Sequence, residues 1–298
     1  MSTLSASGFF FGSLGTILLR YFLFAGALDY WVRTGPKASQ FDGQRIDKKK
    51  PPLGQVRREI GWSILTSLIF SVVGWAAFLA WQSGLTQVYL SVEEKGWAWF
   101  FLSLALMILI HETYFYWTHR WMHHPRVFRL FHRVHHESRV PTAWAAFSFH
   151  PLEALVEALI LPAFLFLFPV HPGAYVVFLF YMTIFSVIHH CGVELYPRGF
   201  ARHWLFRAWV SATHHQAHHS RFVVNYGLYF NFWDRWMKTQ DPRYAESFRN
   251  QDRRPDLRPP GIDSNVPAFV EAPAHLPPDG PLDQPPGPKA SEAPSAWR

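Results

Sequence analysis

Histidine is the residue type with the clearest chemical potential in this chain of 298 residues, which contains 17 of them. Most fall into four short groups: His119-x3-His123, His132-x2-His135-His136, His189-His190, and His214-His215-x2-His218-His219. Residues three or four positions apart share one face of a helix, so each longer group predicts several imidazoles pointing the same way. Two metal ions held mainly by nitrogen need about eight to ten such ligands. The sequence supplies that number.

Imidazole alone leaves the identity of the metal open, because it binds iron, copper, nickel and zinc. Many soluble O2-activating proteins use two histidines and a carboxylate, or repeated Glu-x-x-His pairs, and neither pattern recurs here. A site built from histidines with few anionic ligands favours a redox-active metal that handles O2, although spacing does not exclude zinc. Cys191 is the single cysteine, which rules out an intrachain disulfide and a cysteine-held cluster.

The elements that must position these histidines are apolar stretches of membrane-spanning length. Three of them precede the first group, at about residues 8–32, 60–82 and 97–117. The loop at 33–58 is rich in Lys and Arg, so the positive-inside rule predicts that it is cytoplasmic. The third stretch therefore returns the chain to the cytoplasmic side just before His119.

A further apolar region, residues 151–189, is interrupted by Pro and Gly at 169–173 and predicts a helical hairpin. Because a hairpin crosses twice, His150 and His190 are expected on the same side of the membrane. All histidine groups then lie at the cytoplasmic face. This arrangement follows from charge and length alone.

Composition agrees with a membrane protein that ends in a polar tail. Hydrophobic residues make up 49% of the chain, aromatic residues 18%, and the net charge is +7. With long apolar runs and no nucleic-acid-binding motif, this charge indicates contact with anionic lipid. The stretch 251–298 holds 12 prolines and few large apolar residues, which predicts a disordered tail. We expect N-terminal membrane helices and a basic loop at 1–103, a catalytic domain at 104–250, and this tail.

Residues 105–240 resemble the fatty acid hydroxylase / sterol desaturase superfamily. The resemblance is carried by the histidine motifs in their order, together with Phe-His-Pro-Leu-Glu at 149–153, Asn-Tyr-Gly at 225–227 and Trp-Asp-Arg-Trp at 233–236. The stretch 141–153 and the closing motifs are similar to the C-5 sterol desaturase branch and to many bacterial members.

The resemblance implies an all-α integral-membrane bundle of four to five spans, with a cytoplasmic, histidine-rich helical cap that binds two metals. It implies that nine residues of this chain are metal ligands: His119, His123, His132, His135, His136, His190, His215, His218 and His219. Three neighbouring histidines are weaker candidates: His150, His189 and His214. Asn225 and Asp234 either orient ligands or tie the cap together, and Glu112 stands near the place of an acidic residue found in many members.

The resemblance also implies a non-haem di-iron oxygenase that uses O2 to hydroxylate or desaturate a lipid such as a sterol or fatty acyl chain. No flavin, haem or ferredoxin domain is visible, so a separate electron donor is expected, such as a ferredoxin or cytochrome b5 with its reductase. Two other classes remain open: a membrane zinc-dependent hydrolase, and a metal-binding or transport protein. The position of the histidines at the ends of spans counts against transport.

Overall fold

The described part of the chain, residues 5–251 of a computed structural model, is all helical. Within it the extended backbone makes only three isolated bridges. The expected all-α class is confirmed. The predicted tail at 251–298 lies outside the described residues, except for Gln251 at the end of the last helix.

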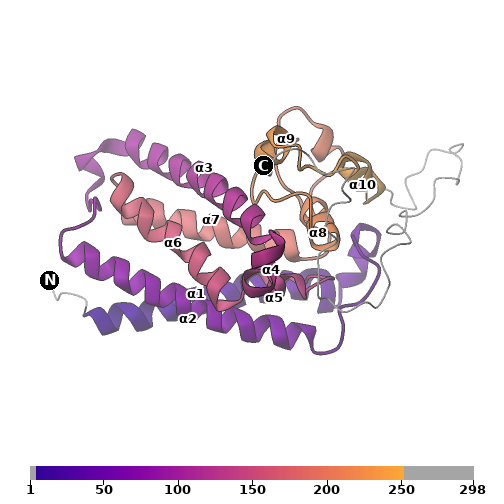
Figure 1. Ribbon diagram of the computed structural model, residues 1–298, viewed down its shortest axis with the longest axis horizontal. Helices are drawn as coiled ribbons and strands as arrows, with labels where there is room; N and C mark the ends of the chain where they lie inside the picture. Colours follow the sequence, from indigo (N-terminus) through magenta and orange to yellow (C-terminus); the bar gives the residue numbers. More distant parts are fainter. Residues whose placement is uncertain (1–4, 252–298) are drawn as a thin grey trace, which may run out of the picture.

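Five long helices run side by side and form the body of the molecule (Figure 1). They are α1 (Ala6–Asp29), α2 (Gln55–Gln82), α3 (Gly96–Met122), α6 (Pro151–Leu167) and α7 (Pro172–His190). Helix α2 packs between α1 and α6, while α7 contacts α1 and α3. Apolar side chains close the space between α3, α6 and α7, with Met107, Phe164 and Phe178 fully buried. This packing places the C-terminal ends of α3 and α7 on the same side of the bundle.

The outer surface of the bundle is apolar, as a lipid-facing surface should be. Four helices are long and apolar enough to cross a bilayer: α1 with the π-helical turn η1 (Tyr30–Thr34), α2, α3 and α7. Large side chains such as Leu19, Phe101 and Leu159 lie exposed on them and on α6. Exposing such groups to water costs about 25 cal/mol per Å². With α6 as a short fifth helix, the predicted four to five spans are confirmed.

The hairpin predicted for 151–189 is present, with a tight connection between α6 and α7. His171 is the N-cap of α7, and its side chain accepts a hydrogen bond from the Gly173 amide at 3.0 Å. Pro172 occupies the first turn, where a missing N–H costs nothing. Helix α6 begins in the same way, with His150 as its N-cap and Pro151 after it.

Short helices form a cap at one end of the bundle, opposite the N-terminus (Figure 1). They are α4 (Pro125–Phe131), α5 (Arg133–His136), η5 (Phe200–Arg202), α8 (Ala212–Arg221), α9 (Phe232–Trp236) and α10 (Tyr244–Gln251). The 3-10 turn η4 (Ala143–Phe147) instead packs against α1, α2 and α7 inside the bundle. Two 3-10 turns lie in the connections: η2 (Ala38–Gln44) and η3 (Val92–Glu94). Phe200, Tyr244 and Phe248 form a small apolar core in the cap. Helix α8 packs against α7 and α10, which sets its histidines beside the end of the bundle.

Candidate metal centre

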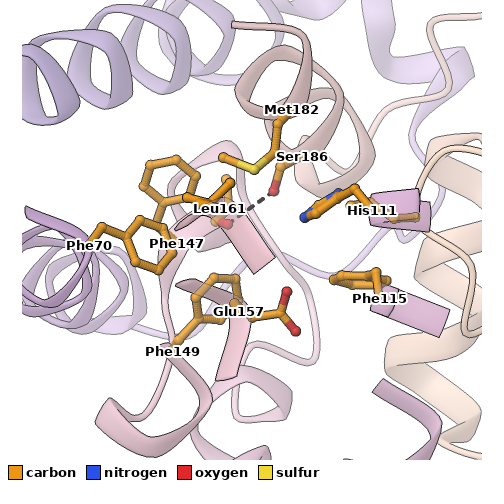
Figure 2. A pocket seen from close by; sticks show the side chains of 11 residues that line it. Phe70, His111, Phe115, Phe147, Phe149, Glu157, Leu161, Met182 and Ser186 are labelled. Atoms are coloured by element: carbon orange, nitrogen blue, oxygen red, sulfur yellow. Dashed lines mark hydrogen bonds between the residues drawn. The ribbon is translucent and has the colours of Figure 1, made fainter. Parts of the chain in front are cut away.

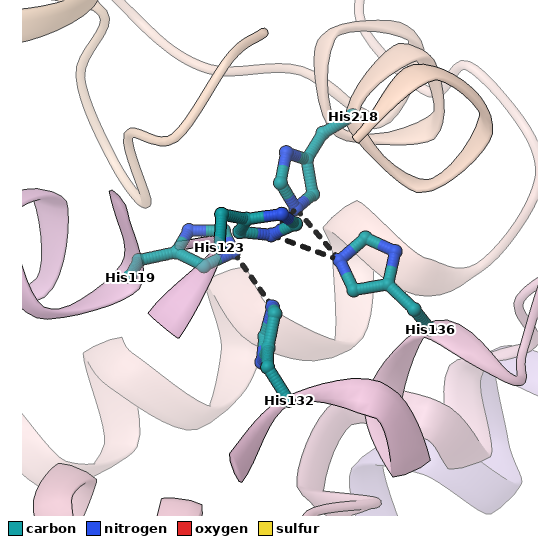
Figure 3. Close-up of side chains that lie close together, drawn as sticks. All are labelled: His119, His123, His132, His136 and His218. Atoms are coloured by element: carbon teal, nitrogen blue, oxygen red, sulfur yellow. Dashed lines mark hydrogen bonds between the residues drawn. The ribbon is translucent and has the colours of Figure 1, made fainter. Parts of the chain in front are cut away.

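Five buried histidines converge in the first of two groups, which we call the five-histidine group (Figure 3). Its members are His119, His123, His132, His136 and His218. The Nε2 atoms of His119 and His132 are 2.9 Å apart. Those of His123, His136 and His218 form a triangle with separations of 3.0 to 3.1 Å. Their ligand atoms all lie within 4.8 Å of one another, which is the spacing of donors around one ion.

The second cluster, the four-histidine group, lies directly beside the first. It contains His135, His190, His215 and His219, all buried. The Nε2 atom of His190 is 3.2 Å from that of His135 and 2.9 Å from that of His215. The ring centroids of His136 and His219, one from each group, are 4.8 Å apart. The two groups are therefore neighbouring sites in one buried pocket.

Helical periodicity explains how one short motif serves both groups. His132 and His136, four residues apart, belong to the five-histidine group, while His135 turns to the other. In α8 the pattern is reversed, because the pair four residues apart enters the four-histidine group and His218 crosses to the five-histidine group. The expectation that the imidazoles of each histidine group point the same way is thus refined: adjacent histidines, about 100° apart on a helix, face two neighbouring sites.

Hydrogen bonds at the far side of the rings determine which nitrogen carries the proton. The Nδ1–H groups of His119, His190 and His218 donate to the backbone carbonyls of Tyr226, Ser186 and Val224, at 2.7 to 2.9 Å. A ring that donates from Nδ1 presents a bare lone pair at Nε2. Bare Nε2 atoms therefore point toward the same small volume. A cation among them removes the repulsion between these lone pairs, so the donor set fits a bound metal.

Burial keeps the remaining rings in the form that binds metal. It lowers the pKa of His123, His135, His136, His215 and His219 well below the usual value, because a buried imidazolium loses its hydration. Neighbouring histidines lower these pKa values further. The rings are neutral at pH 7, and neutral imidazole is the ligand for iron, zinc and copper.

Comparison with known proteins places this arrangement in a family. The family model described as fatty acid hydroxylase matches residues 104–239, the segment that contributes every histidine of both groups. Residues 104–239 of this chain form a domain of the fatty acid hydroxylase / sterol desaturase superfamily. The four apolar helices and this family together make the chain an integral membrane protein, and the family and the two groups indicate that it uses metal.

Curated relatives of this superfamily member include several sterol-modifying enzymes. The Delta(7)-sterol 5(6)-desaturase ERG3B of Gibberella zeae is 32% identical over 61% of this chain and 55% of its own length. Delta(7)-sterol 5(6)-desaturase erg3C of Aspergillus fumigatus is 31% identical over 72% of this chain and 66% of its own. Lathosterol oxidase of Rattus norvegicus is 28% identical over 61% and 60%. The chain thus spans about 55 to 66% of these relatives, and no solved structure matches it.

Glu153 is a site residue of this family member that sequence reasoning missed. It lies in the first turn of α6, and its Oε1 is 2.6 Å from His132 Nδ1. Both side chains are almost fully buried. A carboxylate behind a ligating histidine orients the ring and makes it a stronger ligand. The available signal was an acid in an otherwise apolar stretch, because intramembrane acids are rarely without a role.

We expect Glu153→Gln to lower metal affinity by roughly 10- to 100-fold, because the amide holds the His132 ring less firmly and polarises it less. The measurement is the metal retained per chain after dialysis against a graded series of chelator concentrations. Glu137→Gln is the matched control, since Glu137 is partly exposed and pairs with arginines rather than with a histidine of either group. If the two variants retained the same amount of metal per chain, Glu153 would have no part in metal binding.

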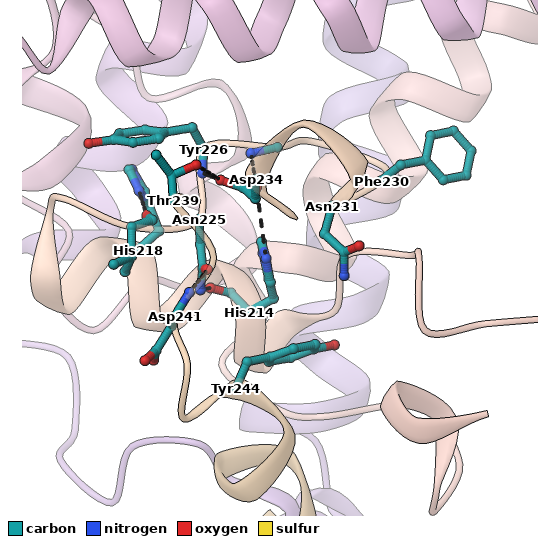
Figure 4. A network of polar contacts seen from close by, with 12 residues as sticks. His214, His218, Asn225, Tyr226, Phe230, Asn231, Asp234, Thr239, Asp241 and Tyr244 are labelled. Atoms are coloured by element: carbon teal, nitrogen blue, oxygen red, sulfur yellow. Dashed lines mark hydrogen bonds and ion pairs between the residues drawn. The ribbon is translucent and has the colours of Figure 1, made fainter. Parts of the chain in front are cut away.

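A loop after α8 supports the five-histidine group from behind. Its backbone N–H groups at Leu228, Tyr229 and Phe230 donate to the Glu112 carboxylate of α3, at 2.6 to 3.2 Å. Those of Tyr226 and Gly227 donate to Asp234, at 2.8 and 2.9 Å (Figure 4). The same Tyr226 offers its carbonyl to His119. Two buried carboxylates therefore fix the backbone that orients a histidine.

Gly227 is required where this loop passes between the two carboxylates. A Cβ at this position would lie 2.3 Å from the Phe230 carbonyl oxygen and about 3 Å from oxygens of Asp234 and Glu112. Asn225 connects the same loop to two other parts of the cap. With a positive φ of 61°, it donates from its side-chain amide to the His214 carbonyl and accepts from the backbone N–H of Asp241. Together with Asp234, which accepts from the backbone N–H groups of Tyr226 and Gly227, it ties the cap together.

The three weaker candidates lie outside both groups. His150 caps α6, where its Nδ1 accepts from the Leu152 amide at 3.3 Å. His189 and His214 are buried, and their ring nitrogens have no hydrogen-bond partner among the described residues. The Nε2 of His214 lies 3.9 Å from an oxygen of Asp234. Their positions are those of residues packed beside the centre.

Proposed function

We propose that this chain is a membrane-bound non-haem di-iron oxygenase that hydroxylates or desaturates a lipid with O2 and electrons from a separate donor. The observation that carries this proposal is the convergence of nine buried histidines in two adjoining groups at the end of an apolar bundle. We assign the ligands of one iron to the five-histidine group and those of the other to the four-histidine group.

Two bound iron ions would supply O2 activation and the oxidising power for an unactivated C–H bond. The protein contributes position and exclusion of water. Glu153 and the carbonyls of Tyr226, Ser186 and Val224 hold ring orientation. Phe115, Met122, Phe149 and Leu228 form an apolar wall beside the histidines. Such a wall admits a hydrocarbon and keeps water away from the reacting atoms.

The substrate class follows from the membrane setting and from the relatives. An enzyme whose apolar helices surround the approach to the metal centre receives its substrate from the bilayer, which favours a lipid. Sterols come first for testing, because the relatives bear names of sterol desaturases and of a sterol oxidase. Fatty acyl chains and related lipids are the next class.

We place the catalytic domain at residues 104–250, the N-terminal membrane helices at 1–103, and the metal centre at the cytoplasmic face. The basic loop between α1 and α2 lies at the same end of the bundle as the cap and supports this orientation. A ferredoxin, or cytochrome b5 with its reductase, reaches the centre from this side. Exposed arginines on the cap, such as Arg126 and Arg139, suit an acidic donor protein.

The decisive test replaces the metal and removes the oxidant. Protein loaded with iron is expected to consume O2 and form an oxidised lipid only when reductant is present, whereas zinc-loaded protein should form no product. Lipid extracts after incubation are analysed by mass spectrometry, with and without O2. Product formed by the zinc form under anaerobic conditions would contradict the oxygenase and favour a zinc-dependent hydrolase.

A further inference from the structure

A small cavity lies among α2, α3, η4, α6 and α7, and Figure 2 shows the side chains that line it. Its volume is about 40 Å³. The walls are mostly apolar, with Phe70, Phe115, Phe147 and Leu161 among them. Three polar side chains also reach it, and one of these, Ser186, already donates to the Ala146 carbonyl at 3.0 Å. The other two are Glu157 and His111.

Glu157 presents an unused oxygen to this cavity. The residue is only 8% exposed, and its Oε1 has no hydrogen-bond partner among the described residues. Figure 2 shows its carboxyl group pointing into the cavity, toward Phe115. A buried polar group without a partner is destabilising, so the presence of one in an apolar wall indicates a ligand that supplies the missing hydrogen bond.

His111 offers a donor to the same space. Its Nδ1 lies 3.0 Å from the hydroxyl of Tyr229, which is fully buried and has no other recorded partner in the described chain. We assign the phenol as the donor, because a phenol that only accepted here would leave its own buried proton without an acceptor, and the ring proton is then on Nε2. The ring points into the cavity (Figure 2). The cavity thus combines one acceptor, the Glu157 carboxyl oxygen, with one donor, the His111 Nε2–H.

The cavity adjoins the metal centre. A second cavity, of about 20 Å³, shares the walls Phe115, Phe149, Glu157, Ser186 and Leu228 with the first. It is also bounded by histidines of both groups, including His119, His132 and His190. Glu157 therefore stands at the boundary between the two, and an atom bound to it lies close to the proposed site of oxidation.

We propose that His111 and Glu157 bind a free hydroxyl group of the lipid substrate, so that the carbon to be oxidised lies close to that hydroxyl. A hydroxyl donates to Glu157 and accepts from His111 at once, whereas a ketone or an ether has no proton to donate. The cavity exceeds the roughly 10–15 Å³ that one water molecule needs, and its walls suit carbon atoms. This inference rests on the proposed function and adds the substrate class of the site: lipids with an unesterified hydroxyl.

The test measures binding to the purified full chain, kept without reductant so that no turnover occurs. Two matched pairs serve as probes: lathosterol with its 3-O-methyl ether, and octadecanol with its methyl ether. Loss of a buried hydrogen bond predicts that the wild-type protein binds the alcohol about tenfold more tightly than the ether in at least one pair. Glu157→Leu and His111→Phe should bring the two affinities within about twofold, and Glu157→Gln should keep most of the preference.

Leu161→Met is the control for cavity shape, and it should change the affinities for alcohol and ether equally. A wild-type chain that binds neither member of either pair, or binds both members equally in both pairs, overturns the inference without any variant. Persistence of the preference in Glu157→Leu also overturns it. Because the assay needs no oxidation, a chain that prefers the alcohol but never oxidises lipid would contradict the proposed function alone.

Discussion

Under the proposed assignment of one iron ion to each group, replacing His218 with alanine is expected to lower the iron content of the purified protein from about two ions to about one per chain and to abolish lipid oxidation. His218 closes the triangle with His123 and His136, and its alanine variant leaves their Nε2 atoms without a shared cation. Loss of a hydrogen-bond partner behind a ligand already costs about 10- to 100-fold. Loss of the ligand itself should lower turnover by more than about 100-fold.

His135→Ala is the corresponding change in the four-histidine group and should also leave about one ion per chain. His203→Ala is the control, because His203 is an exposed histidine of the cap outside both groups. Metal content by mass spectrometry and product formation are measured on the same preparations. Full iron content and full turnover in both ligand variants would refute the assignment of the two groups.

Replacing Glu112 with leucine should cause the largest loss of stability among the changes considered. Three backbone N–H groups of the 228–230 loop would lose their buried acceptor. At about 1–3 kcal/mol for each orphaned donor, the folded state loses at least about 3 kcal/mol. For a protein of this size, that corresponds to a fall of about 6–12 °C in the midpoint of thermal unfolding.

The unfolding midpoint in detergent, followed by intrinsic tryptophan fluorescence, checks this expectation. Glu137→Leu is the control, since its ion pairs with Arg58 and Arg133 are near the surface and contribute about 1 kcal/mol or less. The unfolding midpoint of Glu112→Gln should fall between those of Glu112→Leu and Glu137→Leu. The glutamine carbonyl can still accept from the loop, but its NH2 group would face backbone N–H groups that are also donors. An unchanged midpoint in Glu112→Leu would mean that the loop does not depend on this carboxylate.

Eight of the nine histidines of the two groups could be proposed from sequence because their signal is local, whereas His190 was assigned only through the family resemblance. Spacings of three and four residues, within His119–His123 and 215–219, report one face of a helix. The division between groups could not be predicted in this way. It depends on how α8 sits against α5 and α7, so that His218 meets His123 and His136 from a distant part of the chain.

Contacts between residues far apart in sequence were also out of reach. Glu112 meets the 228–230 loop across more than 100 residues, and Glu153 meets His132 only because α6 returns beside α4. Neither contact produces a repeating pattern of residues in the sequence from which it could be predicted. The membrane hairpin, by contrast, was predictable, since its length and its interruption near Pro172 are encoded within one short stretch.

The two groups draw their rings from α3 and its C-cap residue, from the connection between α4 and α5, from α5 itself, and from α7 and α8. An ion bound there connects the ends of two bilayer helices to the cap, and it binds only the completed fold. By mass action, a ligand held only by the folded chain stabilises that chain in proportion to the logarithm of its free concentration. Under the proposed assignment, cellular iron supply thus governs how long each molecule survives quality control, and scarcity shortens the lifetime of the protein as well as slowing its chemistry.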